Sequence, residues 1–366
     1  MKILQIIQKP QFRGAEIFAC QLSEELINLG HQVDVLFLTG EKEMLPFSLN
    51  FIYLRADLKK RFWDFKAYNA INQIIITGCY DIVQANAADT LKYTAISKFL
   101  YKWEAKLVYR NANKMGDFLG NRLKKFINSF FVKKVDLVAS VSELCKRDFS
   151  VCFPFFKKPI YFLPIGVRVV EGVRYKSFSD IGFSFQNSNV FIHVGSFVPE
   201  KNHGGLVSIF NDYLKSDPSA KLILIGEGKL KESVELLVSE KNLNTNVFFL
   251  GKRNDVLKIV PLCNALLMPS LIEGLPGVIL EAMISKTIVI AYNVGGIGEV
   301  INKETGFLID KDDTESFLTA MISLSKIENR DQIVSNAYDL IYKNYNNVYI
   351  AKEFEKAYFE VINGKN

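Results

Sequence analysis

The chain has few of the residues that build disulfide frameworks or zinc sites: it contains five cysteines and three histidines among 366 residues. The cysteines are odd in number and form no Cys-x-x-Cys pair, which argues against a disulfide scaffold or a zinc ribbon and favours buried thiols in a reducing compartment. The histidines, His31, His193 and His203, lie far apart along the chain. The sequence therefore does not indicate a metal centre built on histidine.

Long apolar runs are also missing. No segment approaches the roughly 18 consecutive apolar residues of a membrane span. The opening, MKILQIIQKP, is too short an apolar stretch for a secretory signal and has no small-residue cleavage site. We therefore expect a cytoplasmic protein whose contact with the inner face of the cell membrane, if it makes one, is peripheral.

The excess of positive charge is small. Lys and Arg together number 45 against 39 Asp and Glu, for a net charge of +6. This charge is mild for a nucleic-acid-binding protein, and no nucleic-acid-binding motif is present, but it directs attention to an anionic partner. With 49% hydrophobic and 23% charged residues, a chain of this length can bury two full cores.

Short strand-like runs alternate with helix-length stretches, which is typical of parallel sheets covered by helices on both faces. The pattern restarts after residues 166–188, which are rich in Gly, Ser and Phe and lack clear periodicity. We therefore predict an α/β protein of two doubly wound, Rossmann-like domains facing each other across a cleft, where ligands of such folds bind. The first domain is residues 1–165 with a C-terminal helix within 345–366, and the second is residues 187–344.

The predicted strands of the two domains are Lys2–Ile7, Gln32–Leu38, Ile82–Ala85, Leu107–Tyr109, Leu137–Val141, Asn189–Val194, Lys221–Ile225, Asn246–Leu250, Ala265–Met268 and Ile288–Ala291. The clearest predicted helices are Ala15–Leu29, Ala88–Tyr101, Val278–Ser285 and Tyr345–Ile362.

The segment Pro269–Ile301 has the richest chemistry. A turn follows a strand, and Pro276 suits the first position of the next helix because its missing N–H would have no partner there. The free N–H groups of that helix start suit a phosphate, and Gly277 lets a ligand approach the backbone. Glu281 lies one turn further on the same face, where it could bind ribose hydroxyls. The alternative is that Glu273 and Glu281 are an ordinary N-terminal acid and a solvated helix residue.

Two further loops carry cations toward the same region. In HVGSFVPEKNH, Gly195 ends a strand and Lys201 precedes a helix, so that Lys201 could neutralise a diphosphate; the alternative is an ordinary solvated lysine. In KPQFRGAE, between the first strand and the first helix, Arg13 and Gly14 offer a cation and a bare backbone.

Glu273 and Glu281, in the context EGLPGVILEAM followed by NVGGIGEVI, resemble the EX7E motif of the retaining glycosyltransferases of family four, which have the GT-B fold. VGSFVPEKNH, LILIGEGKL, FLGKRNDV, TGFLID and the GAE loop resemble other segments of that family in the same order. The resemblance covers nearly the whole chain and is strongest over residues 189–310.

The resemblance implies a role for each matching residue. Glu281 would bind the ribose of a nucleotide-sugar donor, Glu273 would contact the donor sugar and stabilise the developing oxocarbenium ion, and Lys201 would carry the charge of the departing diphosphate. The nucleotide would also lie against the remaining donor-binding residues, which are Gly195, Ser196, Lys252, Arg253, Gly274, Leu275, Pro276, Gly277, Val278 and Ile279. Gly226 and Gly228 would lie near the base.

No metal cofactor is implied, because the helix start and Lys201 would take the place of a cation. Asp310-Lys311-Asp312 matches the Asp-x-Asp of metal-dependent transferases only formally. It follows a C-terminal strand and lies outside the proposed phosphate site, so we interpret it as a surface turn.

Several positions depart from the family pattern. Ser196 stands where an Arg is frequent, so that Arg13 or Arg253 would have to supply the missing charge. Asn86, Arg110 and Asn111 occupy regions of the first domain where acceptor-side histidines would be expected. The departing phosphate can itself take the proton of the incoming hydroxyl, which leaves the general base on the acceptor side open.

Cations and aromatics concentrate in Arg122–Lys134, and similar clusters occur at residues 59–63 and 155–158. Leu123, Phe126, Ile127 and Phe130 fall at helical spacing. One interpretation is a helix that packs this stripe on the sheet; the other is a basic amphipathic surface that rests on anionic lipid.

The sequence thus favours a retaining glycosyltransferase that moves a hexose-type sugar from a UDP-, GDP- or ADP-sugar to an acceptor hydroxyl in cell-surface glycan synthesis, such as lipopolysaccharide or capsule. The acceptor would be a glycan or a lipid-linked intermediate. A GT-B-like nucleotide-sugar epimerase and a non-catalytic subunit that binds sugar nucleotides are the alternatives.

Overall fold

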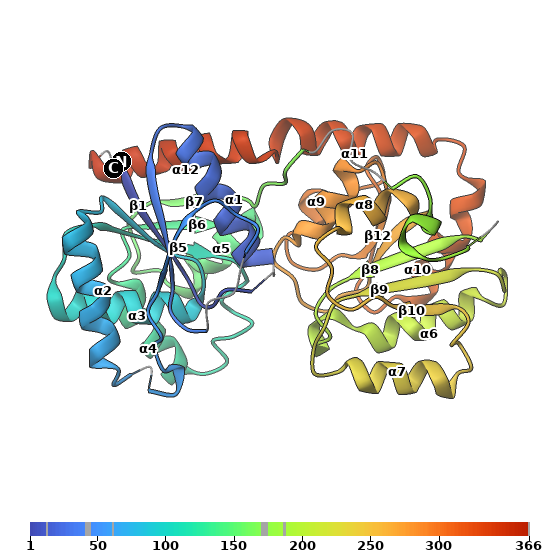
Figure 1. Ribbon diagram of the computed structural model, residues 1–366, viewed down its shortest axis with the longest axis horizontal. Coiled ribbons are helices and arrows are strands. Elements are labelled where there is room, and N and C mark those ends of the chain that lie inside the picture. The colour runs from blue at the N-terminus through green and yellow to red at the C-terminus, as the bar shows by residue number, and fades with distance from the viewer. Residues whose placement is uncertain (12–13, 41–44, 61, 170–174, 186–187, 365–366) are drawn as a thin grey trace. The chain divides into compact units, whose positions relative to one another are not determined.

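The computed structural model describes residues 1–11, 14–40, 45–60, 62–169, 175–185 and 188–364. The chain divides into two compact units, which we call unit 1, Met1–Gly166 with Tyr345–Asn366, and unit 2, Val167–Asn344. Each unit is built on one sheet in which all recorded strand pairs are parallel, with helices on both faces (Figure 1). The predicted pair of doubly wound α/β domains is confirmed.

Unit 1 has a seven-stranded sheet in the order β3-β2-β1-β4-β5-β6-β7. Its strands are β1 (Lys2–Ile7), β2 (Gln32–Phe37), β3 (Asn50–Tyr53), β4 (Ile82–Ala85), β5 (Lys106–Asn111), β6 (Leu137–Ser140) and β7 (Ile160–Phe162). Its helices are α1 (Gly14–Asn28), α2 (Phe65–Gly78), α3 (Ala88–Tyr101), α4 (Arg122–Val132), α5 (Glu143–Cys152) and α12 (Asn347–Ile362). The central strands are apolar on both faces because helices cover both sides of the sheet.

Unit 2 has a six-stranded sheet in the order β10-β9-β8-β11-β12-β13. Its strands are β8 (Val190–Val194), β9 (Lys221–Ile225), β10 (Val247–Phe249), β11 (Ala265–Met268), β12 (Ile288–Tyr292) and β13 (Phe307–Ile309). Its helices are α6 (His203–Tyr213), α7 (Lys231–Glu240), α8 (Val256–Ile259), α9 (Gly277–Ile284), α10 (Thr314–Ser323) and α11 (Arg330–Asn344).

The last helix, α12, packs in unit 1 although it follows unit 2 in sequence. It lies beside α1 (Figure 1), where the rings of Phe354 and Phe18 are 6.0 Å apart. The amide of Asn347 donates to Gln21 at 3.2 Å, and the hydroxyl of Tyr358 donates to Gln84 on β4 at 2.7 Å. The C-terminal helix therefore forms part of the first core.

The segment that separates the two strand sets packs on unit 2. Phe183 and Phe185 contact Phe248 of edge strand β10, with ring centroids 5.4 and 4.9 Å apart. The structure divides the chain at Gly166, and the phenylalanines that made this stretch look aperiodic cover the edge of the second sheet.

The five cysteines are free thiols, as the sequence indicates, but only three of them are buried. Cys79 is exposed and Cys152 is half-buried, so the expectation of buried thiols is wrong for these two. Cys79 follows the last turn of α2 and has the left-handed conformation that often ends a helix. At this position its side chain faces solvent.

Candidate functional site

The loops that carry Lys201 and Glu273 leave neighbouring strands at the same edge of the second sheet. β8 and β11 are paired and parallel, so the loops after them begin side by side. The N–H of Leu271 donates to the carbonyl of Glu200 at 2.7 Å, and the side-chain amide of Asn202 donates to the carbonyl of Pro269 at 3.1 Å. These bonds tie the two loops together before any ligand binds.

An ion pair joins the two loops. Nζ of Lys201 lies 2.5 Å from Oε1 of Glu273, although the residues are 72 positions apart. The side chain of Lys201 is 20% exposed and that of Glu273 is 8% exposed. Water screens the pair only partly, so the attraction is stronger than that of a surface ion pair. Lys201 is therefore not an ordinary solvated lysine.

Two glycines allow the site loops to approach other backbone closely. A Cβ at Gly295 would lie 2.0 Å from the carbonyl oxygen of Glu273, and the N–H of Gly296 donates to the carbonyl of Gly274 at 2.5 Å. A Cβ at Gly226 would lie 1.9 Å from the carbonyl oxygen of Gly195. Both Gly295 and Gly226 have positive φ, at 57° and 145°. Only glycine fits these two positions.

Helix α9 begins at Gly277, directly after the turn that carries Glu273. Pro276 precedes the helix in an extended conformation rather than opening it, because its ψ of 126° lies outside the helical range. Among the described residues, the N–H groups of Gly277 and Val278 have no acceptor. The N–H of Ile279 donates to the carbonyl of Pro276 at 3.1 Å, so this N–H group is not free to bind an anion. Two open donors and the positive end of the helix dipole make this position suited to an anion.

Glu281 lies one turn along α9 and is half-buried. Burial raises the pKa of its carboxyl from 4.5 to about 7. No hydrogen-bond donor to this carboxyl is found in the part of the chain that the structure describes. A desolvated acceptor without a donor is poised to receive hydroxyl groups from a ligand.

Two histidines that the sequence analysis left unassigned lie beneath Lys201. His193, on β8, and His203, at the start of α6, have ring centroids 4.6 Å apart, and His203 stacks on Phe197 at 3.9 Å. Burial holds the pKa of His203 at about 4 and that of His193 well below its usual range, so both rings are neutral. The only signal in the sequence is that each histidine flanks the loop that ends in Lys201.

The two cations expected to lie against the nucleotide, Lys252 and Arg253, have different environments. Lys252 is exposed, whereas Arg253 forms two hydrogen bonds with Asp255 at 2.7 and 2.5 Å. The hydroxyl of Tyr175 also donates to Asp255, at 2.8 Å, and these partners lower the pKa of Asp255 to about 2. Arg253 is therefore already engaged.

The two predicted residues of the GAE loop have different outcomes. Gly14 is exposed at the start of α1, and a Cβ there would meet no protein atom within 4 Å. Arg13 lies outside the described residues.

The three predicted acceptor-side residues of unit 1 are all buried. The amide of Asn86 donates to Gln5 at 2.8 Å and accepts from Gln84 at 3.0 Å. The amide of Asn111 donates to the carbonyl of Cys145 at 3.2 Å. Oδ1 of Asn111 and both Nε and Nη1 of Arg110 are buried without a hydrogen-bond partner among the described residues.

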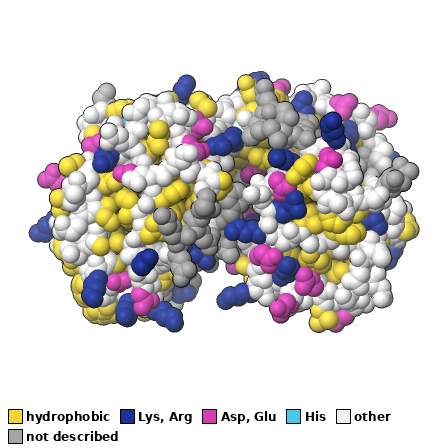
Figure 2. Space-filling model, in the orientation of Figure 1, with side chains coloured by type: hydrophobic (Ala, Val, Ile, Leu, Met, Phe, Trp, Pro, Cys, Tyr) yellow, Lys and Arg dark blue, Asp and Glu magenta, His cyan; other side chains and the backbone are white. Residues whose placement is uncertain are grey.

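The aromatic and basic segments of unit 1 lie together on its surface. Only Phe131 and Val132 of α4 are buried, whereas Leu123 and Phe126 are 66% and 75% exposed. The stripe therefore faces outward, which contradicts the interpretation that it packs on the sheet. Figure 2 shows hydrophobic and basic side chains gathered over the part of unit 1 that carries α2 to α4. We call this the aromatic–basic surface; its members are Lys59, Lys60, Phe62, Trp63, Phe99, Leu123, Lys124, Lys125, Phe126, Ile127, Phe130, Lys133, Lys134 and Phe155.

Ring contacts join the segments of this surface. Phe130 of α4 packs on Phe99 of α3 at 5.2 Å, and Nζ of Lys134 lies 4.9 Å from the ring of Phe99. Nζ of Lys133 lies 5.7 Å from the ring of Phe155. Clusters that are separate in sequence thus form one surface.

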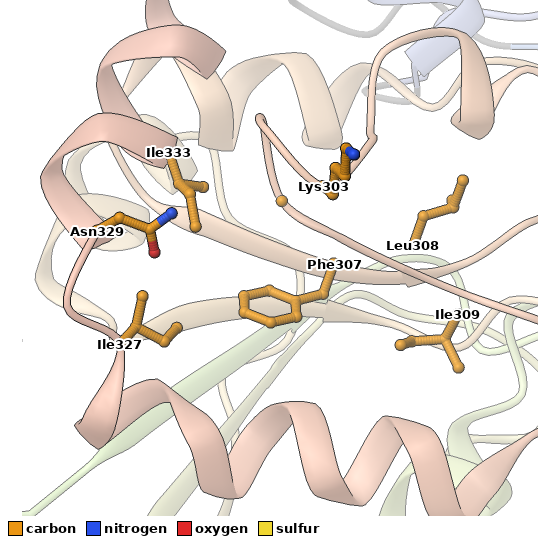
Figure 3. Close-up of a pocket in the computed structure, with 8 residues that line it drawn as sticks. Lys303, Phe307, Leu308, Ile309, Ile327, Asn329 and Ile333 are labelled. Atoms are coloured by element: carbon orange, nitrogen blue, oxygen red, sulfur yellow. The ribbon is translucent and has the colours of Figure 1, made fainter.

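One pocket of about 420 Å³ lies in unit 2 at the edge of the sheet. It contains none of the predicted site residues, and Figure 3 shows Phe307 of β13 between the side chains of Ile327 and Leu308. Its lining residues are Lys303, Gly306, Phe307, Leu308, Ile309, Ile327, Asn329 and Ile333. The candidate site is thus made of loop ends rather than of this pocket.

Within the described ranges, no three His, Cys, Asp or Glu side chains come together in a group that could hold a metal ion. Asp310 and Asp312 lie in the turn after β13, with Asp312 at a φ of 68°. In the same part of the chain, none of the helices has the length and apolar character needed to cross a bilayer.

Comparison with known families matches each unit to one family. Residues 12–170 match Glycosyltransferase Family 4, and residues 176–340 match Glycosyl transferases group 1. Together the two matches span nearly the whole chain.

Among characterised relatives, the chain is 24% identical to N-acetyl-alpha-D-glucosaminyl L-malate synthase of Bacillus anthracis over 97% of both chains. It is 27% identical to the UDP-Gal:alpha-D-GlcNAc-diphosphoundecaprenol alpha-1,3-galactosyltransferase of Escherichia coli, over 61% of this chain and 60% of that protein. Among solved structures, Anabaena HepE in complex with UDP-glucose superposes with a TM-score of 0.83 at 18% identity, covering 98% of this chain and 99% of that one.

Proposed function

We propose, from the premise that this chain is a glycosyltransferase of the GT-B fold, that unit 2 binds a nucleotide-sugar donor and that the sugar passes with retention of configuration to an acceptor hydroxyl. The observation that carries the proposal is the Lys201–Glu273 ion pair, which lies at the turn leading into α9. A cation, a carboxylate and two open N–H groups meet where a diphosphate and its sugar would need them.

The donor would lie along α9. Its diphosphate would accept hydrogen bonds from the N–H groups of Gly277 and Val278 and would face Nζ of Lys201. Its ribose hydroxyls would donate to Glu281, whose carboxyl lies one turn further along the helix. The sugar beyond the diphosphate would then lie beside Glu273.

The same residues support transfer without a metal cofactor. As the bond from the sugar to the diphosphate breaks, negative charge grows on the leaving phosphate and positive charge on the sugar ring. Lys201 and the α9 N-terminus stabilise the phosphate, and Glu273 stabilises the ring. The leaving phosphate takes the proton of the incoming hydroxyl, so that this chain need not supply a general base.

A thermal-shift screen tests the donor. UDP-, GDP- and ADP-sugars are added to the full chain in buffer with EDTA, and one class should raise the melting temperature because it binds the native state. Glu281→Gln should reduce that shift, whereas Glu304→Gln, which changes an exposed carboxylate of unit 2, should not. A shift that appears only when a divalent cation is added would contradict the metal-independent site.

NMR of the product tests the stereochemistry. The anomeric coupling constant of the transferred sugar should match that of the donor. An inverted product would exclude the retaining reaction, and conversion of the donor sugar to its epimer without acceptor would favour an epimerase instead.

We also propose that the acceptor is a glycan or a lipid-linked intermediate and that the aromatic–basic surface rests on anionic lipid at the cytoplasmic face of the membrane. The Escherichia coli relative is named for a diphosphoundecaprenol substrate, and HepE was solved with UDP-glucose. Exposed Phe126 and Leu123 between lysines have the chemistry of an interfacial helix, to which each Lys near an anionic surface adds about 1 kcal/mol.

Vesicle flotation tests this contact. The chain should float with phosphatidylglycerol vesicles at low salt but not with phosphatidylcholine vesicles. Phe126→Ala should weaken flotation, whereas Leu236→Ala, which changes an exposed leucine of unit 2, should not. Equal flotation of both variants would contradict the assignment of the surface.

A further inference from the structure

Arg110 is the charged residue among the predicted acceptor-side residues, and it has hydrogen-bond donors unmet by the described residues. It is only 2% exposed, and both Nε and Nη1 are buried without a partner in the described part of the chain. Burial lowers the pKa of its guanidinium to about 10, so that it still carries a positive charge at neutral pH. An unmet donor on a buried cation is costly, which calls for an explanation beyond packing.

The surroundings of Arg110 do not supply the missing acceptors. The guanidinium carbon lies 4.4 Å from the centre of the Phe18 ring, which offers a π face but no hydrogen-bond acceptor. The charge of Glu16 favours the charged form of Arg110, but its carboxyl also accepts from Gln11 at 2.6 Å. One face of Arg110 is therefore occupied by an aromatic ring, and its buried Nε and Nη1 donors remain unmet by the described residues.

The position of Arg110 in the fold suits a ligand. It is the last residue but one of β5, a central strand of a parallel sheet, and Phe18 is in the second turn of α1. Ligands of such sheets bind beyond the carboxyl ends of the strands, where the N-terminus of the following helix also favours negative charge. Asn86 and Asn111 lie at the ends of the neighbouring strand and of the same strand. The Asn86 amide is bound internally, whereas Asn111 donates to Cys145 and its Oδ1 has no partner among the described residues.

From these observations we infer that Arg110 anchors an anionic group of the acceptor, a carboxylate or a diphosphate, through Nε and Nη1. The inference rests on the proposed function, because it specifies the class of acceptor that unit 1 receives. A guanidinium with unmet N–H donors on Nε and on Nη1 can donate charge-assisted hydrogen bonds to the oxygens of either group. The names of two relatives contain such groups: L-malate in one and diphosphoundecaprenol in the other.

Calorimetry with four probes tests the inference. L-Malate and farnesyl diphosphate carry the two anionic groups, and glycerol and farnesol are their uncharged counterparts. One of the anions should bind the full chain, and its uncharged counterpart should not. Arg110→Gln should raise the Kd of that anion at least about tenfold, as expected when a charged hydrogen bond of roughly 1.5–3 kcal/mol is lost.

Controls separate this inference from the proposed function. Arg147→Gln removes an exposed cation from α5 of the same unit and should leave anion binding unchanged. Donor binding in the thermal-shift screen should be the same in Arg110→Gln and in the unmodified chain. If the unmodified chain binds no nucleotide sugar, the proposed function is contradicted. If it binds a nucleotide sugar but neither anion, only the role of Arg110 is overturned.

Arg110→Lys keeps the test decisive if Arg110→Gln does not fold. Lysine preserves the charge but not the N–H donors at the positions of Nε and Nη1, so the acceptor KM should rise while kcat and donor affinity change little. An acceptor KM and an anion Kd equal to those of the unmodified chain would overturn the inference.

Discussion

The two units use the same kind of parallel sheet but treat their polar groups differently. In unit 2, Lys201 is paired with Glu273, and the loops that carry them are joined by hydrogen bonds. In unit 1, Arg110 is buried over an aromatic ring with two donors unmet. The charged pair of the proposed donor site is thus formed without a ligand, whereas the charge of the proposed anion site has donors left for one.

The largest expected effect comes from breaking the assembled pair of unit 2. Glu273→Ala and Lys201→Ala should each lower kcat by about 10²–10³-fold, the usual loss when a transition-state charge is left unstabilised. The double variant should be about as impaired as either single variant, because the two side chains act as a unit. Steady-state kinetics with the donor found in the screen measures all three.

Glu304→Ala is the matched control for that comparison, since it removes an exposed carboxylate of the same unit. It should leave kcat unchanged. Unchanged turnover in Glu273→Ala would remove the catalytic role of the pair.

The next effect concerns the backbone contact behind Glu273. Gly295→Ala would add a Cβ 2.0 Å from a carbonyl oxygen at a positive φ, so that the turn must move. Gly182→Ala has a φ of 84° and no atom within 4 Å of the new Cβ. Denaturant unfolding should show about 1–2 kcal/mol of destabilisation at Gly182 from the left-handed backbone and clearly more at Gly295. Equal losses would show that the contact is not tight.

A smaller effect tests the desolvated carboxyl of Glu281. Burial raises its pKa in the folded chain from 4.5 to about 7, so the native state holds more protons than the unfolded state between these values. Stability should therefore fall as pH rises from 4.5 to 7, and the penalty should be full above pH 7. Glu281→Gln should be more stable than the unmodified chain by about 1–3 kcal/mol at pH 8 and similar to it at pH 4.

The same variant should bind the donor more weakly, because a carboxylate accepts hydroxyl hydrogen bonds better than an amide does. Chemical denaturation at pH 4 and 8, with donor titrations at pH 8, measures both properties. A variant with the same pH profile and the same donor affinity would assign Glu281 to an ordinary solvated surface.

The smallest effect sharpens the account of unit 1. Tyr358→Phe removes the hydrogen bond from α12 to Gln84 and leaves a buried acceptor unmet. We expect a loss of about 1–3 kcal/mol in the free energy of unfolding. Tyr349→Phe, at a half-exposed tyrosine of the same helix, should change stability by less than about 0.5 kcal/mol. Equal effects would show that the buried network does not hold α12.

Much of the fold could be predicted because it depends on local pattern. β1, β4, β9 and β11 are inner strands made mostly of buried apolar residues, and they lie at the predicted residues. β3 and β7 were not predicted, and β13 was expected only as the strand before Asp310, without its bounds. All three are edge strands whose residues are exposed or half-buried, so they lack the apolar run that marks a covered strand.

The candidate site divides in the same way. Glu273, Gly277 and Glu281 are close in sequence, so their placement around the start of α9 follows from helix geometry. Lys201 and Glu273 follow neighbouring strands, so their pairing could not be predicted from spacing. The contact of His193 with His203 could not be predicted from spacing either. The outward direction of the α4 stripe likewise depends on what the sheet leaves uncovered.

The sequence by itself determined the alternation of strands and helices, the turn before α9 and the kinds of side chain available for a donor site, because each depends on residues within a few positions of one another. Only the tertiary structure decided which polar groups are already satisfied. The Asn86 amide is bound within the first core, whereas Oδ1 of Asn111 and two donors of Arg110 have no partner among the described residues. Hydrogen bonding in a buried site depends on atoms from several strands and helices, and no local pattern specifies their meeting.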